Sequence, residues 1–453
     1  MNERELAGAI AQEVDRLGGR AYFVGGCVRD RLLGLESRDI DIEVYGVKAD
    51  RLEQLLSRFG EVKVNHSFGV FNIDGCDLDI TMPRTEVRTG VKHNEFKIKI
   101  EPFLAIEEAA KRRDFTVNAI MENVLTGKIT DPVNGKADLQ GRVIRPVDPK
   151  KFSEDPLRVL RAARFAAYLD FTFDAATILL CRGMDLSSLT KERVFAETKS
   201  TLLNAERPSV FFEALREFRQ LDDWFPEIKN LIDVPQNETA HKEGDVWRHT
   251  MMVLDEAAKK RDGANNPLGL MLSALCHDLG KAVTVTVGGD GVHHSYGHEK
   301  EGVPLAGAFL ERLTSSKALK DYVLNMVELH QDPHKKVQQN SSLKSFNHMF
   351  DKSVCPLDLL ALVECDSLGR NPALFEEKKV LYDRFSQYCD VMAKPFVSGK
   401  DLIAAGIKPN NHFKELLEYA HKLRLADVDK DNALKQVLAY DRKNRRKEKG
   451  NER

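Results

Sequence analysis

The sequence lacks any apolar run that approaches the length of a membrane-spanning helix, so helical membrane spans are not expected. Its N-terminal segment, MNERELAGAIAQEVDRLGG, also lacks the apolar centre of a signal peptide and is predicted to form a charged amphipathic helix. The seven cysteines are scattered and include no CxxC pair, which is typical of reduced thiols in a long cytosolic chain. We therefore expect a cytoplasmic protein with no membrane partner.

An excess of charge of one sign is absent as well. Lys and Arg together number 68 and Asp and Glu number 70, which leaves a formal net charge of −2. A nucleic-acid partner would therefore meet a local basic surface and not the whole protein. The composition, 42% apolar and 30% charged, is that of a globular protein with substantial cores. At 453 residues the chain is too long for one ordinary domain and predicts two to four.

The order of structural signals predicts an α+β protein with a small N-terminal sheet and a mostly helical remainder. Between residues 20 and 82, RAYFV, GVFNIDG and DLDITMP are predicted strands, and GGCVRDRLLG and DRLEQLLSRFG are predicted helices. From about residue 104 onward, apolar residues recur at helical spacing. The charge run DRKNRRKEKGNER near the C-terminus is predicted to be a solvated helix end or a disordered tail.

One predicted strand, RDIDIEVYG (residues 38–46), carries acidic residues along one face. Asp39, Asp41 and Glu43 alternate with apolar residues, so neighbours on that face lie about 6.5–7 Å apart at Cα. Carboxylates at this spacing can converge on Mg²⁺, and paired Mg²⁺ ions can activate a hydroxyl and stabilise a leaving pyrophosphate. An exposed edge strand whose charges discourage aggregation fits the strand alone equally well.

The flanking segments favour the metal interpretation. Upstream, YFVGGCVRD predicts a strand, a turn at Gly25-Gly26 and a helix. Glycines at such a turn allow close backbone approach to a phosphate, and the helix N-terminus favours an anion. Arg29 lies in the first turn of that helix and could add a positive charge. A third carboxylate, Asp79, lies on a neighbouring predicted strand, with Asp77 as the competing choice on the same face.

Five ordered motifs give the chain a family resemblance. Gly-Gly followed by Asp-x-Asp resembles the nucleotidyltransferase superfamily of polymerase-β type, and the full set resembles the bacterial tRNA nucleotidyltransferase and poly(A) polymerase family. The resemblance covers roughly residues 20–230 and implies an N-terminal nucleotidyltransferase palm followed by an all-α neck and body. The motifs are GGCVRDRLLG (25–34), RDIDIEVYG (38–46), RRDFTVNAI (112–120), DPVNGKADLQGRVIR (131–145) and EDPLRVLRAARFAA (154–167).

The resemblance implies roles for the matching residues. Asp39 and Asp41 would hold catalytic Mg²⁺, with Asp79 as an additional catalytic carboxylate. The implied substrates are CTP, ATP and the 3′ end of tRNA, whose acceptor arm would contact the protein. The implied nucleotide-binding residues are Gly26 and Arg29 at the triphosphate, Arg113 at the nucleotide, and Asp155 and Arg158 at the base.

The EDPLR motif has a chemistry that suits base recognition. An Asp offers acceptors and an Arg offers fixed donors, so Asp155 and Arg158 together could hydrogen-bond the Watson–Crick edge of C or A, as a protein template. At i and i+3 on a helix they project to nearly the same side. Arg161 and Arg164 continue this stripe and could reach nucleotide phosphates. A solvated helix face with an intrahelical ion pair is the commoner arrangement, and only the motif context favours nucleotide binding.

The segment RTEVRTGVKHNEFKIKIEP (residues 84–102) is polar, basic and interrupted by glycine. It resembles the flexible segment that family members use when they switch from adding C to adding A. Its presence favours an enzyme that adds A as well as C. The alternative is a mobile surface loop with no such role.

A second group of candidate residues lies farther along the chain. An adjacent His-Asp pair on a helix, in ALCHDLGKA, with a distant His on a preceding helix, in VWRHTMMVLDEAA, resembles the HD-domain phosphohydrolases. This resemblance covers about residues 240–370 and implies an all-α domain. In chain order the candidates are His249, His277, Asp278, His298, His330 and Asp366.

Imidazole and carboxylate together suit a first-row divalent metal such as Mn²⁺, Ni²⁺, Fe²⁺ or Zn²⁺. Such a metal could lower the pKa of a bound water, which would then attack a phosphate ester. His298 and His330 could bind the substrate phosphate or a second metal. The expected mononuclear site consists of His249, His277, Asp278 and Asp366.

These observations predict four regions and a bifunctional enzyme. We expect a CCA-adding tRNA nucleotidyltransferase whose HD domain acts as a phosphatase, 2′-nucleotidase or 2′,3′-cyclic phosphodiesterase. It would work as a monomer or homodimer without a DNA partner. The regions are a palm (1–148), a helical neck and body (149–235), an HD domain (236–370) and a C-terminal helical region (371–453).

Two alternatives remain at the level of sequence. The same fold could serve a bacterial poly(A) polymerase, or an enzyme that adds only CC or only A. A hypothesis of another class makes the N-terminal half an RNA-binding module that serves an HD phosphohydrolase. The intact Asp39, Asp41 and Arg113 argue against this second alternative.

Overall fold

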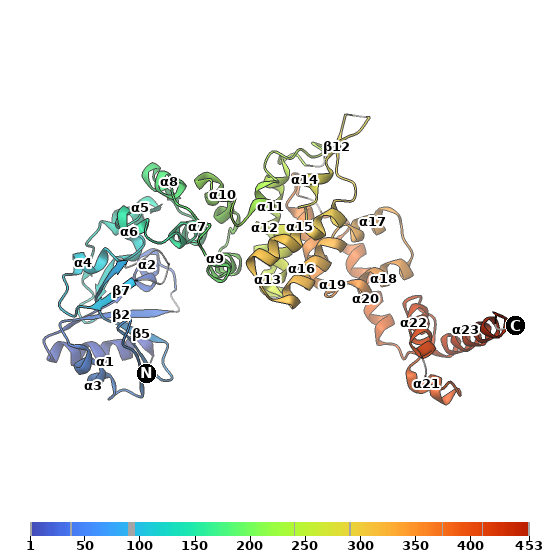
Figure 1. Cartoon of the computed structure of the whole chain (residues 1–453), viewed down its shortest axis with the longest axis horizontal. Helices are drawn as coiled ribbons and strands as arrows, with labels where there is room; N and C mark the ends of the chain where they lie inside the picture. Colours follow the sequence, from blue (N-terminus) through green and yellow to red (C-terminus); the bar gives the residue numbers. More distant parts are fainter. Residues whose placement is uncertain are drawn as a thin grey trace. The chain divides into compact units, whose positions relative to one another are not determined.

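The structure is a computed structural model that describes residues 2–36, 39–88, 96–239, 241–289, 291–373, 375–409 and 411–451. The chain forms two compact units, residues 1–223 and residues 224–453. Figure 1 shows the sheet in the first unit and a mostly helical second unit. The predicted α+β class is therefore confirmed. The four finer regions stay a prediction.

A seven-stranded mixed sheet forms the centre of the first unit, in the order β3-β4-β5-β2-β1-β8-β9. Only β2 and β5 pair in parallel among these strands, and the other neighbours are antiparallel. The strands are β1 (Arg20–Val24), β2 (Ile40–Tyr45), β3 (Val62–Asn65), β4 (Val70–Ile73), β5 (Leu78–Thr81), β8 (Met121–Asn123) and β9 (Ile129–Thr130).

Three helices accompany the N-terminal strands: α1 (Glu3–Arg16), α2 (Gly26–Leu33) and α3 (Ala49–Leu56). The predicted N-terminal helix is confirmed. It begins with a capping box in which the Asn2 side chain accepts from the Glu5 backbone N–H, and the Glu5 carboxylate accepts from Asn2 N–H. Its apolar stripe is buried, which ties it to β1 and α3.

The predicted flexible segment, residues 84–102, proves to be strand at both of its described ends. β6 (Arg84–Arg88) pairs antiparallel with β7 (Phe96–Ile100), from Arg84 opposite Ile100 to Arg88 opposite Phe96. Alternation of Lys and β-branched Ile in KIKI suits a strand, and this period outweighs the polar composition. The expectation of a flexible loop is therefore wrong for these flanks, and residues 89–95 lie outside the described residues.

Helices make up most of the remaining first unit. The central one is α7 (Leu157–Leu169), which packs against α9 and α10 through a face rich in buried alanine. The other elements are α4 (Ile106–Ala110), η1 (Thr116–Asn118), α5 (Gly135–Gly141), β10 (Val143–Ile144), α6 (Pro149–Phe152), β11 (Thr172–Phe173), α8 (Ala175–Arg182), α9 (Lys191–Asn204) and α10 (Ser209–Phe218).

The second unit is built around α13 (Pro267–Cys276), whose residues from Gly269 to Cys276 are all buried. It packs against α12 (Val246–Lys260), α16 (Lys317–Leu329) and α19 (Pro356–Leu368), and α15 (His298–Leu313) packs on α16. Also present are α11 (Pro226–Lys229), η2 (Arg261–Gly263), α14 (Lys281–Thr284), β12 (Thr286–Val287), β13 (His293–His294), α17 (Asp332–Gln338), α18 (Leu343–Lys352) and α20 (Lys378–Ala393).

The C-terminal end of this unit is helical, as predicted. It consists of α21 (Gly399–Ala404), α22 (Asn411–Leu425) and α23 (Lys430–Asn451), and the charge run continues α23. A small apolar cluster that includes Leu402 and Leu416 holds these helices together. Among the described helices, none is both long and apolar enough to cross a membrane.

Candidate functional sites

Three carboxylates lie together where β2 and β5 run side by side. The parallel register places Asp41 opposite Asp79, and Asp39 immediately precedes β2. Burial, together with the negative charges of Asp79 and Asp39, raises the pKa of Asp41 to about 6 against the opposing effect of Arg113. The register favours Asp79 over Asp77, which lies outside β5. Clustered oxygen donors with a raised pKa are the setting in which a hard cation is favoured.

The turn between β1 and α2 borders these carboxylates. Gly25 adopts a φ of +74°, and a Cβ added to it would lie 3.4 Å from Asp41 Oδ2 and 3.6 Å from Arg113 NH1. Glycine thus keeps side-chain atoms out of the space between the turn and the Asp41 carboxylate. Gly26 begins α2, so the helix N-terminus lies at the same turn.

Arg29 lies in the wall of this site. Its guanidinium is buried, donates from Nε to Asp30 Oδ1 at 2.8 Å, and donates from NH1 to Asn118 Oδ1 at 2.7 Å. The guanidinium is therefore already paired within the protein. Contact between Arg29 and a triphosphate stays a prediction.

Glu43 anchors two arginines. Its buried carboxylate accepts from Arg112 NH2 at 2.7 Å and from Arg113 NH2 at 3.1 Å. Burial alone would raise the pKa of Glu43, but the two guanidiniums lower it below its ordinary value. The sequence placed Glu43 on the face of Asp39 and Asp41 without a role, and the structure makes it the residue that positions Arg113.

Asp155 and Arg158 lie near the start of α7, and a third residue joins them. Asp155 accepts from Leu157 N–H at 2.9 Å and from Arg193 NH2 at 3.0 Å. Arg158 donates from NH2 to the Arg112 carbonyl at 3.2 Å. Among the described residues, NH1 of Arg158 and NH1 of Arg193 are buried without a hydrogen-bond partner. Two unpaired donors beside a carboxylate can serve a ligand that offers acceptors.

The rest of the arginine stripe on α7 is engaged in ion pairs. Arg161 contacts Asp114 Oδ2 through Nε at 2.9 Å and NH2 at 2.6 Å, and Arg164 contacts Glu197 at 2.5 Å. These pairs tie α7 to α9 and to the segment that carries Arg113. The expected phosphate contacts of Arg161 and Arg164 stay a prediction.

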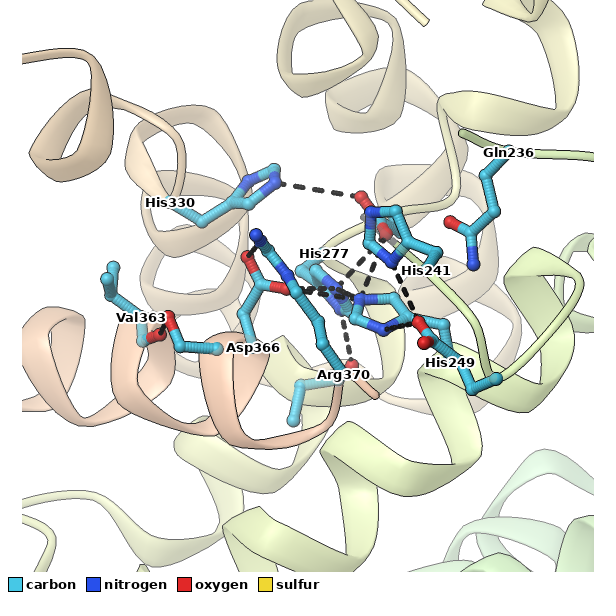
Figure 2. Close-up of polar contacts among 12 residues, drawn as sticks. Gln236, His241, His249, His277, His330, Val363, Asp366 and Arg370 are labelled. Atoms are coloured by element: carbon cyan, nitrogen blue, oxygen red, sulfur yellow. Dashed lines mark hydrogen bonds and ion pairs between the residues drawn. The ribbon is translucent and has the colours of Figure 1, made fainter. Parts of the chain in front are cut away.

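The second unit brings all six predicted HD residues together in a buried cluster. They come from five places: α12, the C-terminal end of α13, the start of α15, the C-terminal end of α16 and the C-terminal end of α19. Figure 2 shows His249, His277 and Asp366 directed toward one another, with His330 nearby. His249, His277, Asp278, His298, His330 and Asp366 are all buried.

Backbone hydrogen bonds set the orientation of three imidazoles. Nδ1 of His277, His298 and His330 lies 2.8, 2.8 and 2.7 Å from the carbonyl oxygen three residues earlier in the chain. Donation from Nδ1 leaves the Nε2 lone pair of each ring directed toward the cluster. Burial also lowers the pKa of His330 to about 4, so this ring is neutral at physiological pH.

The donor atoms form two overlapping sets that meet at Asp278. In the first, His249 Nε2 lies 3.1 Å from Asp366 Oδ1, 3.4 Å from His277 Nε2 and 3.5 Å from Asp278 Oδ2. In the second, His298 Nε2 lies 3.2 Å from Asp278 Oδ1 and 3.1 Å from His330 Nε2. The ligand atoms of His249, His277 and Asp366 lie within 4.8 Å of one another, and so do those of Asp278, His298 and His330, so each of these two groups could hold a metal ion.

The environment of Asp278 tests whether a cation fits. Its two oxygens are buried and receive no well-directed hydrogen bond from the described residues, although Lys281 Nζ lies 2.7 Å from Oδ2. Burial alone would raise the pKa of Asp278, but His277 and Lys281 lower it well below its ordinary value. An ionised buried carboxylate among imidazole lone pairs fits a divalent metal of the imidazole-preferring class.

Close packing of the backbone at Gly280 brings His298 near Asp278. A Cβ added to Gly280 would lie 2.0 Å from the His298 carbonyl oxygen and 2.7 Å from Gly302 N. Only glycine permits this approach, which places His298 beside Asp278. The sequence HDLGK therefore contributes a packing residue as well as two candidate ligands.

Sequence reasoning missed four residues that contact these ligands. Lys281 and Arg370 had a signal, since each lies one helical turn after a candidate carboxylate: Arg370 NH2 is 2.8 Å from Asp366 Oδ2. Glu243 and His241 lie in a turn-rich loop and had none. Glu243 Oε1 is 3.1 Å from His249 Nδ1 and 2.7 Å from His241 Nδ1.

The contacts of Glu243 match those of a carboxylate that orients a metal-ligating imidazole. Its Oε2 accepts from Asn371 N–H at 2.9 Å, which fixes the carboxylate, and its Oε1 faces the Nδ1 side of His249. A hydrogen on Nδ1 leaves the Nε2 lone pair facing Asp366 and His277. Glu243 is thus placed to position His249 by charge and proximity, since the 3.1 Å approach to Nδ1 is not a well-directed hydrogen bond.

Comparison with known proteins adds independent findings. The family model of the poly A polymerase head domain matches residues 21–145, and that of the HD domain matches residues 246–392. A multifunctional CCA protein of Actinobacillus pleuropneumoniae is 39% identical over 360 residues, which cover 77% of this chain and 85% of that protein. One of Pasteurella multocida is 37% identical over 340 residues, covering 73% and 79%.

Solved structures share the fold. The Thermotoga maritima CCA-adding enzyme complexed with tRNA aligns with a TM-score of 0.62 at 20% identity, over 96% of this chain and 95% of that one. A CCA-adding enzyme in complex with CTP aligns with a TM-score of 0.64 at 21% identity, over 96% and 94%. Together with the two family models, these likenesses in fold confirm the predicted arrangement of a nucleotidyltransferase domain, a helical body and an HD domain.

The raised pKa of Asp41 predicts that Mg²⁺ binding is sensitive to pH. Below a pKa of about 6 the carboxyl is protonated and cannot ligate a metal, so affinity should fall about tenfold from about pH 7.5 to about pH 5. We would measure this by calorimetry in the His277→Ala/Asp278→Ala background, which removes the other cluster. Asp41→Asn in this background should abolish the dependence of Mg²⁺ affinity on pH. If the affinity of the protein with Asp41 intact did not change with pH, Asp41 would not be a metal ligand.

The contacts of Glu243 predict that Glu243→Gln weakens metal binding in the HD cluster. Loss of an orienting carboxylate should lower Mn²⁺ affinity about 10- to 100-fold, because the amide polarises the His249 ring less. Titration followed by electron paramagnetic resonance measures it. Glu238→Gln, an exposed change in the same loop, is the matched control. Equal affinities in the two variants would refute the positioning role.

Proposed function

We propose that this chain, which belongs to the family of multifunctional CCA proteins, adds C, C and A to the 3′ end of tRNA from CTP and ATP. The observation that carries the proposal is the alignment of Asp41 with Asp79 beside the Gly25 turn, in the unit that contains Asp155 and Arg158. The carboxylates Asp41 and Asp79 suit phosphoryl transfer, and Asp155 with Arg158 suits base recognition. Poly(A) synthesis and partial CCA addition are not favoured, since the relatives are CCA proteins.

The carboxylates would hold Mg²⁺ during the reaction. Asp39, Asp41 and Asp79 fit this ion because they bring oxygen donors to neighbouring positions at β2 and β5. The raised pKa of Asp41 reports its burial and the repulsion between carboxylates, which a cation relieves. When bound, Mg²⁺ supplies activation of the tRNA 3′-hydroxyl and stabilisation of pyrophosphate. The protein would position the nucleotide, because the Gly25-Gly26 turn would bind its triphosphate.

The base of the incoming nucleotide would be read by three side chains. Asp155 accepts, while NH1 of Arg158 and NH1 of Arg193 have no partner among the described residues and can donate. C and A each present an exocyclic amine donor beside a ring-nitrogen acceptor on their Watson–Crick edge, whereas U and G present a carbonyl acceptor beside a ring N–H donor. Such a set can therefore select C and A over U and G. Arg193 extends the pair that the sequence motif indicates.

The HD cluster would catalyse phosphohydrolysis. A bound divalent metal supplies a water of lowered pKa at this site. His249, His277, Asp278 and Asp366 would ligate it, and His298 and His330 would bind the substrate phosphate or a second ion. Lys281 adds positive charge beside the cluster. We expect phosphatase, 2′-nucleotidase and 2′,3′-cyclic phosphodiesterase activity from the resemblance of the motif.

The cellular location and the partners of the enzyme are the next part of the proposal. All seven cysteines are free, which fits the expected cytoplasmic location. The tRNA would contact the protein through its acceptor arm. Monomer or homodimer, and the absence of a DNA partner, stay predictions. The alternative of an RNA-binding module that serves the HD domain is not favoured, because the carboxylate cluster of the first unit is complete.

Asp41→Asn should abolish nucleotide addition and leave phosphohydrolysis intact, because the carboxylate belongs only to the first site. His277→Ala should abolish phosphohydrolysis and leave addition intact. Labelled CTP incorporation into tRNA and release of p-nitrophenol from bis-p-nitrophenyl phosphate measure the two activities on the same preparations. If either substitution abolished both activities, nucleotide addition and phosphohydrolysis would not occur at two independent sites.

Arg158→Ala should impair base selection. Removal of one base contact should lower kcat/KM for CTP and ATP about ten- to a hundredfold and reduce the preference for these nucleotides over UTP and GTP. Single-nucleotide incorporation kinetics measure both effects. Lys199→Ala, an exposed change on α9, is the control. Unchanged selectivity in Arg158→Ala would contradict the role in base recognition.

A further inference from the structure

One face of the sheet continues beyond the carboxylates of the first site and has no role in the function described so far. The register that sets Asp41 opposite Asp79 also sets Asp79 opposite Asn72 on β4, and Asn72 opposite Lys63 on β3. Residues that lie directly opposite one another on neighbouring strands point to the same face of a sheet. Asp41, Asp79, Asn72 and Lys63 therefore form one cross-strand row.

The face that carries this cross-strand row is open over β5, β4 and β3. Asp79 and Lys63 are exposed and Asn72 is half-buried, whereas Ile80, which points to the opposite face, is buried. Because neighbouring strands lie about 4.8 Å apart, Asn72 is about 10 Å and Lys63 about 14 Å from Asp41 at Cα. The row thus leads from the candidate metal ligands to the edge of the sheet at β3.

Asn72 holds the carboxylate of Asp79. Its Nδ2 donates a hydrogen bond to Asp79 Oδ1, between residues that lie directly opposite each other on β4 and β5. A carboxylate that is held through one oxygen presents the other oxygen in a fixed direction, which suits a ligand of Mg²⁺. The Asn72 side chain is therefore placed to orient a candidate metal ligand of the first site.

The chemistry of nucleotidyl transfer decides which substrate lies over this face. In an in-line displacement, the attacking and leaving oxygens lie on opposite sides of the phosphorus. The Gly25-Gly26 turn, proposed above to bind the triphosphate, follows β1, and β1 and β5 lie on opposite sides of β2. Since pyrophosphate then leaves on the β1 side of Asp41, the attacking hydroxyl enters from the β5 side, where Asp79 and Asn72 lie.

The charges on this face determine where an RNA backbone can be contacted. Lys63 forms an ion pair with Asp74 in which the two side chains are 69% and 56% exposed. An exposed pair of this kind contributes little to stability, so Lys63 can exchange Asp74 for a phosphate at little cost. Glu61 is also exposed, and its carbonyl accepts from Asp74 N–H at 2.8 Å. These two carboxylates disfavour phosphates at their end of the strands, which leaves Lys63 as the phosphate contact.

We propose that the exposed face of β5, β4 and β3 receives the 3′ end of the RNA that is extended. Asn72 is a positioning residue that orients the Asp79 carboxylate beside the attacking hydroxyl. Lys63 binds a backbone phosphate of the RNA close to its terminal nucleotide. The proposal rests on the nucleotidyltransferase function proposed for the first unit, to which it adds the side from which the RNA enters and two residues that receive it.

Kinetics of single C addition by the full-length protein test the Lys63 contact. Lys63→Gln should raise the KM for a tRNA transcript that lacks CCA about three- to tenfold and leave the KM for CTP unchanged, because only the RNA loses a contact. The slope of log KM against log salt concentration should fall by about 0.7, the value for one phosphate of a single strand. Lys128→Gln, which removes an exposed lysine beside the opposite edge strand β9, should change neither. A rise in the KM for CTP in place of the KM for tRNA would overturn the proposal.

Asp74→Asn separates a phosphate contact from an ion pair that only joins β3 to the end of β4. Asp74→Asn and Lys63→Gln both break the pair, so a purely structural role requires the same change in the KM for tRNA from each. A phosphate contact predicts opposite changes: Asp74→Asn should lower this KM, because it frees Lys63 and removes a repelling charge. Changes in the same direction would overturn the contact.

Asn72→Ala tests the positioning of Asp79. The Mg²⁺ concentration that gives half the maximal rate of C addition should rise several-fold with the KM for CTP unchanged, because Asp79 loses the hydrogen bond that fixes it. Asn65→Ala, an exposed change on β3, is the matched control, and thermal melting verifies the folding of both variants. An unchanged Mg²⁺ requirement in Asn72→Ala would refute the positioning role.

Binding without turnover separates this proposal from the function on which it rests. Fluorescence anisotropy of a labelled tRNA transcript, with Mg²⁺ and without nucleotide, should show weaker binding by Lys63→Gln than by Lys128→Gln. If the wild-type protein adds no nucleotide, the proposed function fails, whereas the comparison of these two variants still decides whether RNA lies over this face. Equal affinities of the two variants would overturn the proposed surface.

Discussion

The placement of buried carboxylates relative to cations determines what each part of this protein can do. Glu43 and Glu197 are buried and Asp114 is half-buried, each with an arginine partner, and the guanidiniums lower the pKa of Glu43 and Asp114. Such pairs connect the strands and helices around the first site. Asp41 differs, because burial and two neighbouring carboxylates raise its pKa to about 6. An added cation would offset the cost of its burial and relieve the repulsion from Asp79 and Asp39.

Different features of the backbone bring the candidate ligands together at the two sites. In the first unit, the parallel register of β2 and β5 aligns Asp41 with Asp79, and the φ of Gly25 keeps the adjacent turn clear. In the second unit, helix ends converge and carbonyls of the preceding turn orient the imidazoles. Gly280 allows the approach that completes the second donor set. Oxygen donors dominate the first site and imidazoles the second, which fits Mg²⁺ and a first-row transition metal respectively.

Much of this arrangement could be predicted from sequence, because it depends on local patterns. Alternation placed Asp39 and Asp41 on one face, and the His-Asp pair with its helical neighbours indicated all six residues of the HD cluster. Glu243 could not be predicted, because its contacts to His249 and Asn371 are made only when a loop folds back on a distant segment. Arg193 was missed because α9 approaches the start of α7 only in the folded chain. The pairing of Arg161 with Asp114 and the strands within residues 84–102 were hidden by composition.

In our proposal, one site in the first unit adds C, C and A in order. A primer-extension assay on a tRNA transcript that lacks its 3′ CCA, with Mg²⁺ present, measures this sequence of additions. We expect two additions with CTP alone, and CCA followed by a stop with CTP and ATP together. Long A tails, addition that ends after CC with both nucleotides, or A addition to a CC end without any C addition would contradict it.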